Sequence, residues 1–590
     1  MKIKHLFGLA VIAAMTASCS SNEDLGTAGP GTGTNETGVG YATFTINLPS
    51  VSGTRAADAG GAEMDEGTAK EYAVKSATAL IFQKYGSDEG SCKFVESVDL
   101  PTAAADWTDD TTGGITTTSK KLVAKLTNVD TKNQYYVLVL LNNNKTGGVK
   151  VPLPTVGQSY NEWNSQILTP SVDDLAADND FYMANAPLKG TASPTTLVTI
   201  NKENIYSSKE KAEAGTSAAT VYVERGVAKM SVTDPTTKTV IDKATNTPTQ
   251  STVEFNNWAL DITNKKTYAV HNIDGLSTDF PAIWTTPRFI GTNSRVYWGK
   301  DPNYNLAELN TADDVNDKKR KEEFNFIDAT SKIDKDFGET NPVYCLENTF
   351  NLANMYQGQT TRVIFKATYT PKDDAGNPLA DKDGTFYTIG NMTTILKAAA
   401  LETAVNTAAT SVLPGCTVDY TNLKQEGSHV ITLADIKDST GTTLVADTDY
   451  NGKTGTQIVK EINDKLGLID GAEHAEAMVG INTYAKGVTY YIARVKHFGS
   501  LTPWNSGESY GTDNGKYLGR YGMLRNNWYE LTVGNVYGPG YPGVPPVDPT
   551  QPDDENEKYL SVSVKILSWA KRSDCLLYTS PSPRDKRQSR

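Results

Sequence analysis

The chain is 590 residues long, which is more than one hydrophobic core can organise, because single cores stop growing at about 250 to 300 residues. Hydrophobic residues make up 38% of it, Tyr is the commonest aromatic residue with 29 copies, and the formal net charge is −13. This composition is typical of half-buried strands with polar outer faces, and the negative charge argues against nucleic acid or an anionic membrane surface as a partner.

Residues 1–19 have the parts of an export signal. Lys2 and Lys4 precede an apolar stretch, Leu6 to Met15, which is too short to span a bilayer. The following Thr16-Ala-Ser-Cys19 resembles a lipoprotein signal, in which Cys19 is diacylated, palmitate being an expected acyl chain, and becomes the first residue. Thr16 departs from the usual aliphatic residue, and the alternative is an ordinary secretory signal with Cys19 incidental. The acidic Ser20–Asp24 run resembles the surface-export signal of Bacteroidota lipoproteins.

Residues 20–55 are predicted to be a tether followed by a removable strand. The tether, residues 20–40, is rich in Gly, Thr, Ser and Asn. The strand has one buried face, because apolar residues alternate with polar ones at Ala42, Phe44, Ile46 and Leu48. Gly53-Thr-Arg55-Ala56 then begins a Gly- and Ala-rich stretch. A cut between Arg55 and Ala56 would remove this strand as a propeptide.

The rest of the chain is predicted to be mainly all-β, because short strands are separated by Gly, Pro, Asn and Asp turns. We place an N-terminal β-sandwich at 56–220 and a C-terminal one at 221–536, with the polar Ser207–Ala219 stretch as the boundary. Helical patterns at Thr393–Val405 and Gln457–Leu466 predict an insertion at 371–485 in the second sandwich. The predicted strands are Ser76–Gln83, Gln134–Leu141, Val221–Val232, Ser251–Thr263, Thr361–Tyr369, Val488–Lys496 and Asn527–Val533.

Residues 537–574 are predicted to be a spacer and a last strand. Pro and Gly dominate from Tyr537 to Pro552, which favours an extended segment that cannot join a central sheet. A strand ending near Trp569 follows, with apolar alternation at Leu560, Val562, Val564 and Ile566. Residues 575–590, which include Cys575, match one reading frame of a widely used DNA-sequencing adapter. We expect them to be an artefact that replaces the native C-terminus.

The sequence offers little for catalysis or metal binding. It has no HExxH, CxxC or GxSxG pattern, and Gly452-Lys-Thr454 lacks the first glycine of a P-loop, where Asp447 stands. Asp373-Asp374 and Asp381-Lys-Asp383 could hold calcium, but hairpin turns are the favoured interpretation. A disulfide between Cys345 and Cys416 is left open. The histidines His271, His429, His474 and His497 are scattered, which favours ordinary surface or core positions, and the spacing of the cysteines does not indicate a metal site. The sequence therefore predicts no enzyme, no cofactor and no metal site.

The two terminal strands have matching apolar patterns. If the first were removed, its sheet would have an open groove with unpaired backbone groups, and the last strand of a neighbouring molecule could fill it. Head-to-tail exchange of this kind does not close on itself and gives a filament. The alternative is that both strands belong to one folded monomer.

The chain resembles the fimbrillins of the Bacteroidales type V pilus, in particular the shaft subunit of the short fimbriae, over most of residues 1–574. The resemblance rests on the lipoprotein start and, in order, on Gly53-Thr-Arg-Ala56, Phe181-Tyr-Met-Ala-Asn185, Val223-Glu-Arg-Gly-Val-Ala-Lys229, Tyr344-Cys-Leu-Glu-Asn348, Tyr490-Tyr-Ile-Ala-Arg-Val-Lys-His497 and Arg525-Asn-Asn-Trp-Tyr529.

This resemblance implies two tandem transthyretin-like β-sandwich domains in a lipidated outer-membrane precursor. A trypsin-like, Arg-specific surface protease would cut after Arg55, with Lys70 and Lys75 as other cleavage points nearby. The strand Tyr559–Trp569 of another subunit would then replace Ala42–Leu48. The implied partners are other copies of the chain and accessory pilus subunits, in a cell-surface pilus that supports adhesion.

Three other functions remain open. An anchor subunit of the same pilus should lack the cleavage site at Arg55, and a tip adhesin should lack a usable last strand. A monomeric surface lipoprotein that binds glycans could use Trp504, Tyr510 and Trp528 as an aromatic platform, although Trp528 lies in a strand-like run that favours a place in the core.

Overall fold

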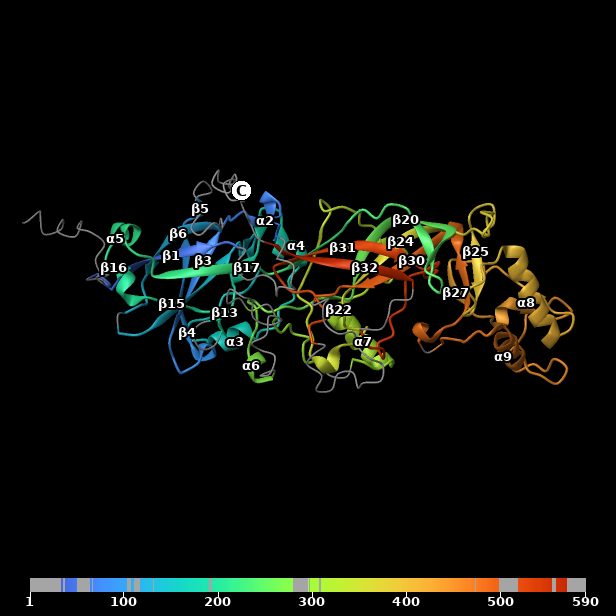
Figure 1. Ribbon diagram of the computed structural model, residues 1–590. Coiled ribbons are helices and arrows are strands. Elements are labelled where there is room, and N and C mark those ends of the chain that lie inside the picture. Colours follow the sequence, from blue (N-terminus) through green and yellow to red (C-terminus); the bar gives the residue numbers. More distant parts are fainter. Residues whose placement is uncertain are drawn as a thin grey trace, which may run out of the picture. The chain divides into compact units, whose positions relative to one another are not determined.

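The computed structural model of the chain describes residues 33–35, 38–49, 64–65, 67–102, 108–110, 117–130, 132–189, 194–279, 296, 298–306, 309–472, 474–497, 518–553 and 559–569. Over these residues the structure is mainly β, which confirms the predicted fold class (Figure 1). The chain forms two compact units. The first contains residues 1–226, 268–299 and 568–590, and the second contains 227–267 and 300–567.

The first unit is built around one large sheet, to which the described residues contribute ten strands in the order β4-β3-β7-β12-β17-β1-β6-β5, with β15 beside β7 and β16 beside β1. Tyr135–Leu141 lies in the interior of the sheet, because it pairs with β3 and β12. The strands of this sheet are β1 (Gly40–Asn47), β3 (Ala77–Gln83), β4 (Lys93–Leu100), β5 (Thr108–Asp110), β6 (Thr117–Leu126), β7 (Tyr135–Leu141), β12 (Met183–Asn185), β15 (Val198–Ile200), β16 (Ile205–Tyr206) and β17 (Ala219–Arg225).

Short elements complete the first unit. The α3 helix begins with a capping box, since the Ser159 hydroxyl accepts from the Glu162 N–H and the Glu162 carboxylate accepts from the Ser159 N–H. The helices are α2 (Ala69–Tyr72), α3 (Tyr160–Asn164), α4 (Val172–Leu175), α5 (Lys209–Ala214) and α6 (Leu276–Asp279), with 3-10 turns at Glu89–Ser91 and Lys202–Asn204. The short strands are β8 (Asn144–Lys145), β9 (Gly148–Val149), β10 (Ala176–Ala177), β11 (Asp180–Phe181), β13 (Leu188–Lys189) and β14 (Pro194–Thr195).

The second unit has a sheet of its own, in the order β32-β31-β19-β20-β24-β30, with β18 beside β23 and β31. Its core is rich in aromatic rings, such as the edge-to-face pair Phe255 and Phe365 at 5.7 Å between centroids. The strands are β18 (Ala228–Val232), β19 (Lys238–Asp242), β20 (Thr247–Asp261), β23 (Val343–Cys345), β24 (Arg362–Thr370), β30 (Val488–Arg494), β31 (Asn527–Val536) and β32 (Leu560–Trp569), with the smaller pair β21 (Thr263–Asn264) and β22 (Phe324–Asn325), helix α7 (Asp314–Glu323) and 3-10 turns at Thr330–Lys332 and Leu352–Asn354.

The predicted insertion in the second unit carries the two longest helices of the described residues, α8 (Ala398–Val412) and α9 (Gly455–Leu466). They pack with a small sheet into a separate core (Figure 1). Helix α8 begins five residues later than predicted, at the Ala run, and ends just before Pro414, which cannot continue it. The strands here are β25 (Phe386–Ile389), β26 (Thr417–Val418), β27 (Gly427–His429), β28 (Ile436–Lys437) and β29 (Ile481–Tyr484), with 3-10 turns at Leu433–Asp435, Ala475–Ala477 and Ala485–Gly487.

One predicted strand, Val221–Val232, is wrong in extent. It is two strands, β17 and β18, interrupted at Gly226, where a side chain would come within 2.8 Å of the Tyr182 ring. The chain passes from the first unit to the second at this glycine, after the predicted Ser207–Ala219 boundary, and residues 268–299 return to the first unit. In the part of the chain that the structure describes, no helix is both long and apolar enough to cross a membrane.

Candidate functional site

The strand predicted to be removable is an interior strand of the first unit. β1 pairs antiparallel with β6 over eight residues, from Gly40 opposite Leu126 to Asn47 opposite Ser119. On its other side it pairs in parallel with β17, where Phe44 lies opposite Ala219 and Asn47 opposite Tyr222. Loss of β1 would therefore leave two strands, β6 and β17, with unpaired backbone groups facing one vacated position.

The apolar face of β1 is part of the core of the first unit. Its predicted apolar residues are almost completely covered: Ala42, Phe44 and Ile46 are 0% exposed and Leu48 is 4% exposed. A fully buried aliphatic or aromatic side chain contributes about 1.5–3 kcal/mol, so this face stabilises the unit by roughly 5–10 kcal/mol. That amount is comparable with the whole stability of an ordinary domain.

The polar face of β1 is covered as well. The Thr43 hydroxyl donates to the Ala212 carbonyl at 2.6 Å, from the α5 segment, and the Thr45 hydroxyl lies 2.6 Å from the Ser217 hydroxyl. The Asn47 side chain donates to the Val221 carbonyl at 3.2 Å. These partners could not be predicted from the sequence. Nothing in the 209–221 segment indicates that it packs on a strand that lies about 170 residues earlier in the chain.

The last strand, β32, is held less completely than β1. It lies beside β31 in the sheet of the second unit (Figure 1), where the Tyr537 N–H donates to the Tyr559 carbonyl and the Asn535 N–H donates to the Ser561 hydroxyl. Of its four predicted apolar residues, Leu560 and Ile566 are 3% and 5% exposed, whereas Val562 and Val564 are only partly buried. Its final two residues, Ser568 and Trp569, belong to the first unit and pair there in parallel with β2 (Met64–Asp65).

The predicted spacer, Tyr537–Pro552, belongs to the second unit and packs against other parts of it. Residues 537–553 are here called the strap. Because prolines offer carbonyl acceptors and no N–H, the strap presents carbonyl groups that accept from side chains facing it. Arg362 donates to the Pro545 carbonyl at 2.6 Å and to the Pro546 carbonyl at 3.0 Å. The Tyr491 and Tyr484 hydroxyls donate to the Gly538 and Gly540 carbonyls, at 2.8 and 3.0 Å.

The two ends of the strap are fixed too. Gly540 has a left-handed backbone, with φ +68, and a side chain on it would come within 2.4 Å of the Tyr490 carbonyl. At the far end the Asp553 N–H donates to the Met355 carbonyl at 3.1 Å, and its carboxylate accepts from the Thr360 hydroxyl at 3.2 Å. The strap therefore ties the approach to the last strand to its own unit. The composition predicts an extended segment, but not which residues supply its donors.

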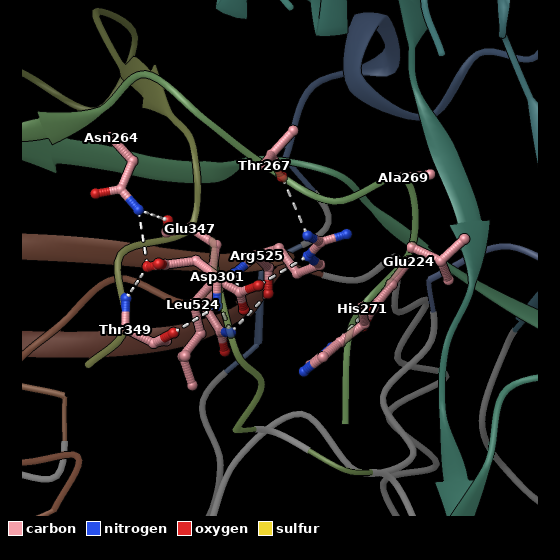
Figure 2. A network of polar contacts seen from close by, with 12 residues as sticks. Glu224, Asn264, Thr267, Ala269, His271, Asp301, Glu347, Thr349, Leu524 and Arg525 are labelled. Atoms are coloured by element: carbon pink, nitrogen blue, oxygen red, sulfur yellow. Dashed lines mark hydrogen bonds and ion pairs between the residues drawn. The ribbon is translucent and has the colours of Figure 1, made fainter. Parts of the chain in front are cut away.

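A buried polar network lies in the second unit, at the motifs Tyr344–Asn348 and Arg525–Tyr529 (Figure 2). The Arg525 guanidinium lies 3.1 Å from the Glu347 carboxylate and donates to the Thr267 hydroxyl at 3.3 Å, with both charged side chains almost fully covered. Breaking a buried pair of this kind by removing one partner typically costs about 3–5 kcal/mol. These motif residues therefore position the start of β31, which lies beside the last strand.

Asp301 is a second buried carboxyl of the same network. It accepts from the Asn264 side chain at 2.7 Å, from the Thr349 N–H at 2.5 Å and from the Asn303 N–H at 2.6 Å (Figure 2). Burial outweighs these donors and raises the pKa of Asp301 to about 7, with a smaller contribution from the nearby Glu347 charge.

Replacing Asp301 by asparagine is expected to flatten the pH dependence of stability. In the native chain the folded pKa of Asp301, about 7, exceeds its unfolded value of 3.8, so its contribution is fully present below about pH 4 and is lost as the pH rises through 7. Between pH 4.5 and 7.5 this group is expected to lower the free energy of unfolding by about 3 kcal/mol. Urea unfolding followed by Trp fluorescence at both pH values measures it. An Asp301→Asn chain with an unchanged pH slope would contradict the assignment.

The motifs that carried the resemblance in the first unit are also structural. The Tyr182 hydroxyl donates to the Ala269 carbonyl at 2.9 Å, and Arg225 donates to the Glu71 carbonyl at 2.9 Å. Glu224 lies 2.8 Å from Nδ1 of His271 (Figure 2). In the second unit the Lys229 ammonium lies 3.5 Å from the centre of the Trp528 ring, which is 4% exposed. Trp528 is therefore not available for a glycan platform, and Trp504 and Tyr510 lie outside the described residues.

The other sequence candidates do not come together. Cys92, Cys345 and Cys416 are each buried and free, so the bridge left open between Cys345 and Cys416 is not formed. The Asp373 carboxylate accepts from the Ala375 and Asn377 N–H groups of its own turn, and Asp383 does the same for Thr385. His271, His429, His474 and His497 lie in four separate places. Among the described residues, no three His, Cys, Asp or Glu side chains are grouped as metal ligands would be.

Several predicted site residues lie outside the described residues. These are the lipidation residue Cys19, the cleavage residues Arg55 and Ala56, and the adapter-like tail with Cys575. Lys70, one of the other predicted cleavage points, lies in α2 and forms an exposed ion pair with Asp178 at 2.6 Å.

The C-terminal part of the chain matches a known family. Residues 482–574 match the family described as major fimbrial subunit protein type IV, fimbrillin, C-terminal. The predicted resemblance to the fimbrillins is confirmed over these residues. The matched fimbrillin region begins in β29 and contains β30, β31, the strap and β32, so the last strand and its attachment both belong to it. No curated protein is significantly similar to the chain in sequence.

Several solved structures are similar to the chain at low identity. A Parabacteroides distasonis structure described as a cell adhesion protein is 11% identical, with a TM-score of 0.35 over 90% of this chain and 97% of that one. A fimbrial assembly protein from the same organism is 13% identical, with a TM-score of 0.26 over 60% and 93%. The tip fimbrial protein Mfa3 of Porphyromonas gingivalis, with a C-terminal truncation, is 11% identical, with a TM-score of 0.28 over 90% and 100%.

Proposed function

We propose that the protein is a structural, non-catalytic subunit of a cell-surface fimbria that supports adhesion. It is exported as a lipoprotein acylated at Cys19 and held in the outer membrane as a precursor. A trypsin-like surface protease cuts between Arg55 and Ala56 and releases β1, and the mature subunit begins at Ala56. The C-terminal strand of the next copy then occupies the vacated position, so that subunits and accessory pilus proteins join head to tail.

The observation that carries this proposal is the unequal burial of the two terminal strands. The apolar residues of β1 fill positions that are almost completely covered, and β1 precedes the proposed cut. The last strand has the same apolar spacing, but Val562 and Val564 are only partly buried in its own unit. Transfer of the last strand into the position of β1 would bury these two side chains further and pair the backbone groups of β6 and β17. Both effects favour exchange once β1 has left, and they oppose the loss of the contacts that the strand makes in its own unit.

Limited proteolysis tests the proposal on the full chain with Cys19 and Cys575 replaced by serine. We expect trypsin to leave Ala56 as the first residue, and the cut protein to form a ladder of multimers that survives mild detergent. Terminal sequencing identifies the cut, and light scattering follows the mass. A clean cut that leaves monomers would overturn polymerisation and favour a tip adhesin or a monomeric surface lipoprotein.

A further inference from the structure

The position of β1 has a polar side that can distinguish one register of an incoming strand from another. On that side the Ala212 carbonyl accepts from Thr43 and the Ser217 hydroxyl lies against Thr45, each at 2.6 Å. Thr43 is 1% exposed and Thr45 is half-buried, so the 209–217 segment covers most of this side. When β1 leaves, the Ala212 carbonyl and the Ser217 hydroxyl each lose a hydrogen-bond partner inside the groove.

The last strand carries hydroxyl groups at the matching spacing. If its four apolar residues take the positions of the four apolar residues of β1 in order, then Ser561 takes the position of Thr43 and Ser563 that of Thr45. Lys565 takes the position of Asn47 and retains a donor for the Val221 carbonyl.

The apolar residues exclude registers shifted by two residues, but they do not match the residues of β1 one by one. A shift of two residues in one direction would place Lys558 at the position of Ala42, which is 0% exposed. The opposite shift would place Ser568 at the position of Leu48, which is 4% exposed. In the unshifted register, however, the sizes do not match one by one, because Leu560 is larger than Ala42 and Val562 is smaller than Phe44. The polar side therefore supplies the residue-by-residue match that the apolar side lacks.

We propose that Ser561 and Ser563 of a second copy fix the register of the exchanged strand, by hydrogen bonding to the Ala212 carbonyl and the Ser217 hydroxyl. This inference rests on the proposed function, since it applies to a chain whose β1 has been removed. Beyond the proposed function, it names the two residues by which the groove of one copy would recognise the last strand of a second copy.

Cysteine pairs report the register directly. In the full chain with Cys19→Ser and Cys575→Ser, we introduce Ser217→Cys together with Ser563→Cys, cut with trypsin and oxidise. Because the two side chains would face each other across copies, we expect a ladder of covalent multimers on non-reducing gels. The matched controls pair Ser217→Cys with Ser561→Cys or with Lys565→Cys. Side chains two positions away on a strand lie about 6.6 Å from the first, which exceeds the usual Cβ separation of about 3.5–4.5 Å in a disulfide.

The uncut chain supplies a positive control, because Thr45→Cys with Ser217→Cys should form a disulfide within one molecule. Two outcomes would overturn the register but not strand exchange. In the first, multimers are cross-linked equally well or better through position 561 or 565. In the second, multimers form but none of the three pairs is cross-linked, although the positive control is. A cut chain that forms no multimers would overturn both the register and the proposed function.

Removing the hydroxyl groups tests their energetic role. Each lost hydrogen bond is expected to speed the dissociation of multimers in denaturant about fivefold, as measured for Ser561→Ala and Ser563→Ala. Ser561→Thr and Ser563→Thr should retain the native rate, because β1 itself has Thr at these positions. Alanine variants that dissociate at the native rate would overturn the role of the hydroxyls, even where the cross-links form.

Discussion

A chain with Arg55→Gln is expected to stay monomeric under trypsin treatment that makes the native chain assemble. β1 then remains in place, bonded to β6 over eight residue pairs and to β17 over four. Its apolar face alone holds it by roughly 5–10 kcal/mol, so fewer than about one molecule in a thousand would expose the groove spontaneously. Size-exclusion chromatography with light scattering measures the loss of multimers.

The matched control is Arg55→Lys, which keeps a trypsin site and should keep assembly. Mass spectrometry of the Arg55→Gln chain identifies any cut at Lys70 or Lys75, which would also separate β1 from the remainder of the unit. If such a cut occurs and multimers form, Arg55 is not the required site. Multimers of fully intact chains would contradict the requirement for removal of β1.

The sequence predicted the bounds of several strands well. β1 and β32, whose apolar residues alternate, lie within one or two residues of their predicted bounds, since burial of one face of a strand is recorded directly in alternate residues. β3 and β7 lie equally close to their predicted bounds because each is a short apolar run, buried on both faces and flanked by polar residues. The strand across Gly226 was predicted less well, because Val221–Val232 stays apolar on both sides of the point where the chain changes unit.

The partners of the terminal strands could not be predicted in the same way. Residues 209–217 are polar and give no sign that they cover β1, and the donors for the strap come from Arg362 and two tyrosines far away in the sequence. Local pattern fixes which face of a strand is buried, whereas tertiary pairing depends on contacts between distant segments. Asp301 was missed for this reason: its burial depends on Asn264 and Thr349.

A chain with Val564→Asp is expected to fold and to be cut at Arg55, yet to fail as a donor. In its own unit Val564 is only partly buried, so a carboxylate there can reach water. In the groove the same residue would replace Ile46, which is 0% exposed, and an unpaired buried charge costs at least several kcal/mol. We expect assembly to fall by more than about a hundredfold, with Val564→Ile as the matched control that assembles normally.

Mixing the two defective chains separates donor from acceptor. The Arg55→Gln chain keeps β1 and can only donate its last strand, whereas the cut Val564→Asp chain has an open groove and can only accept. Because each pair formed in this way has no further donor or groove, the mixture should stop at dimers that contain one copy of each chain. Native mass spectrometry with one isotope-labelled partner counts them. Longer multimers, or dimers of a single chain type, would mean that subunits join through a surface other than the β1 groove and the last strand.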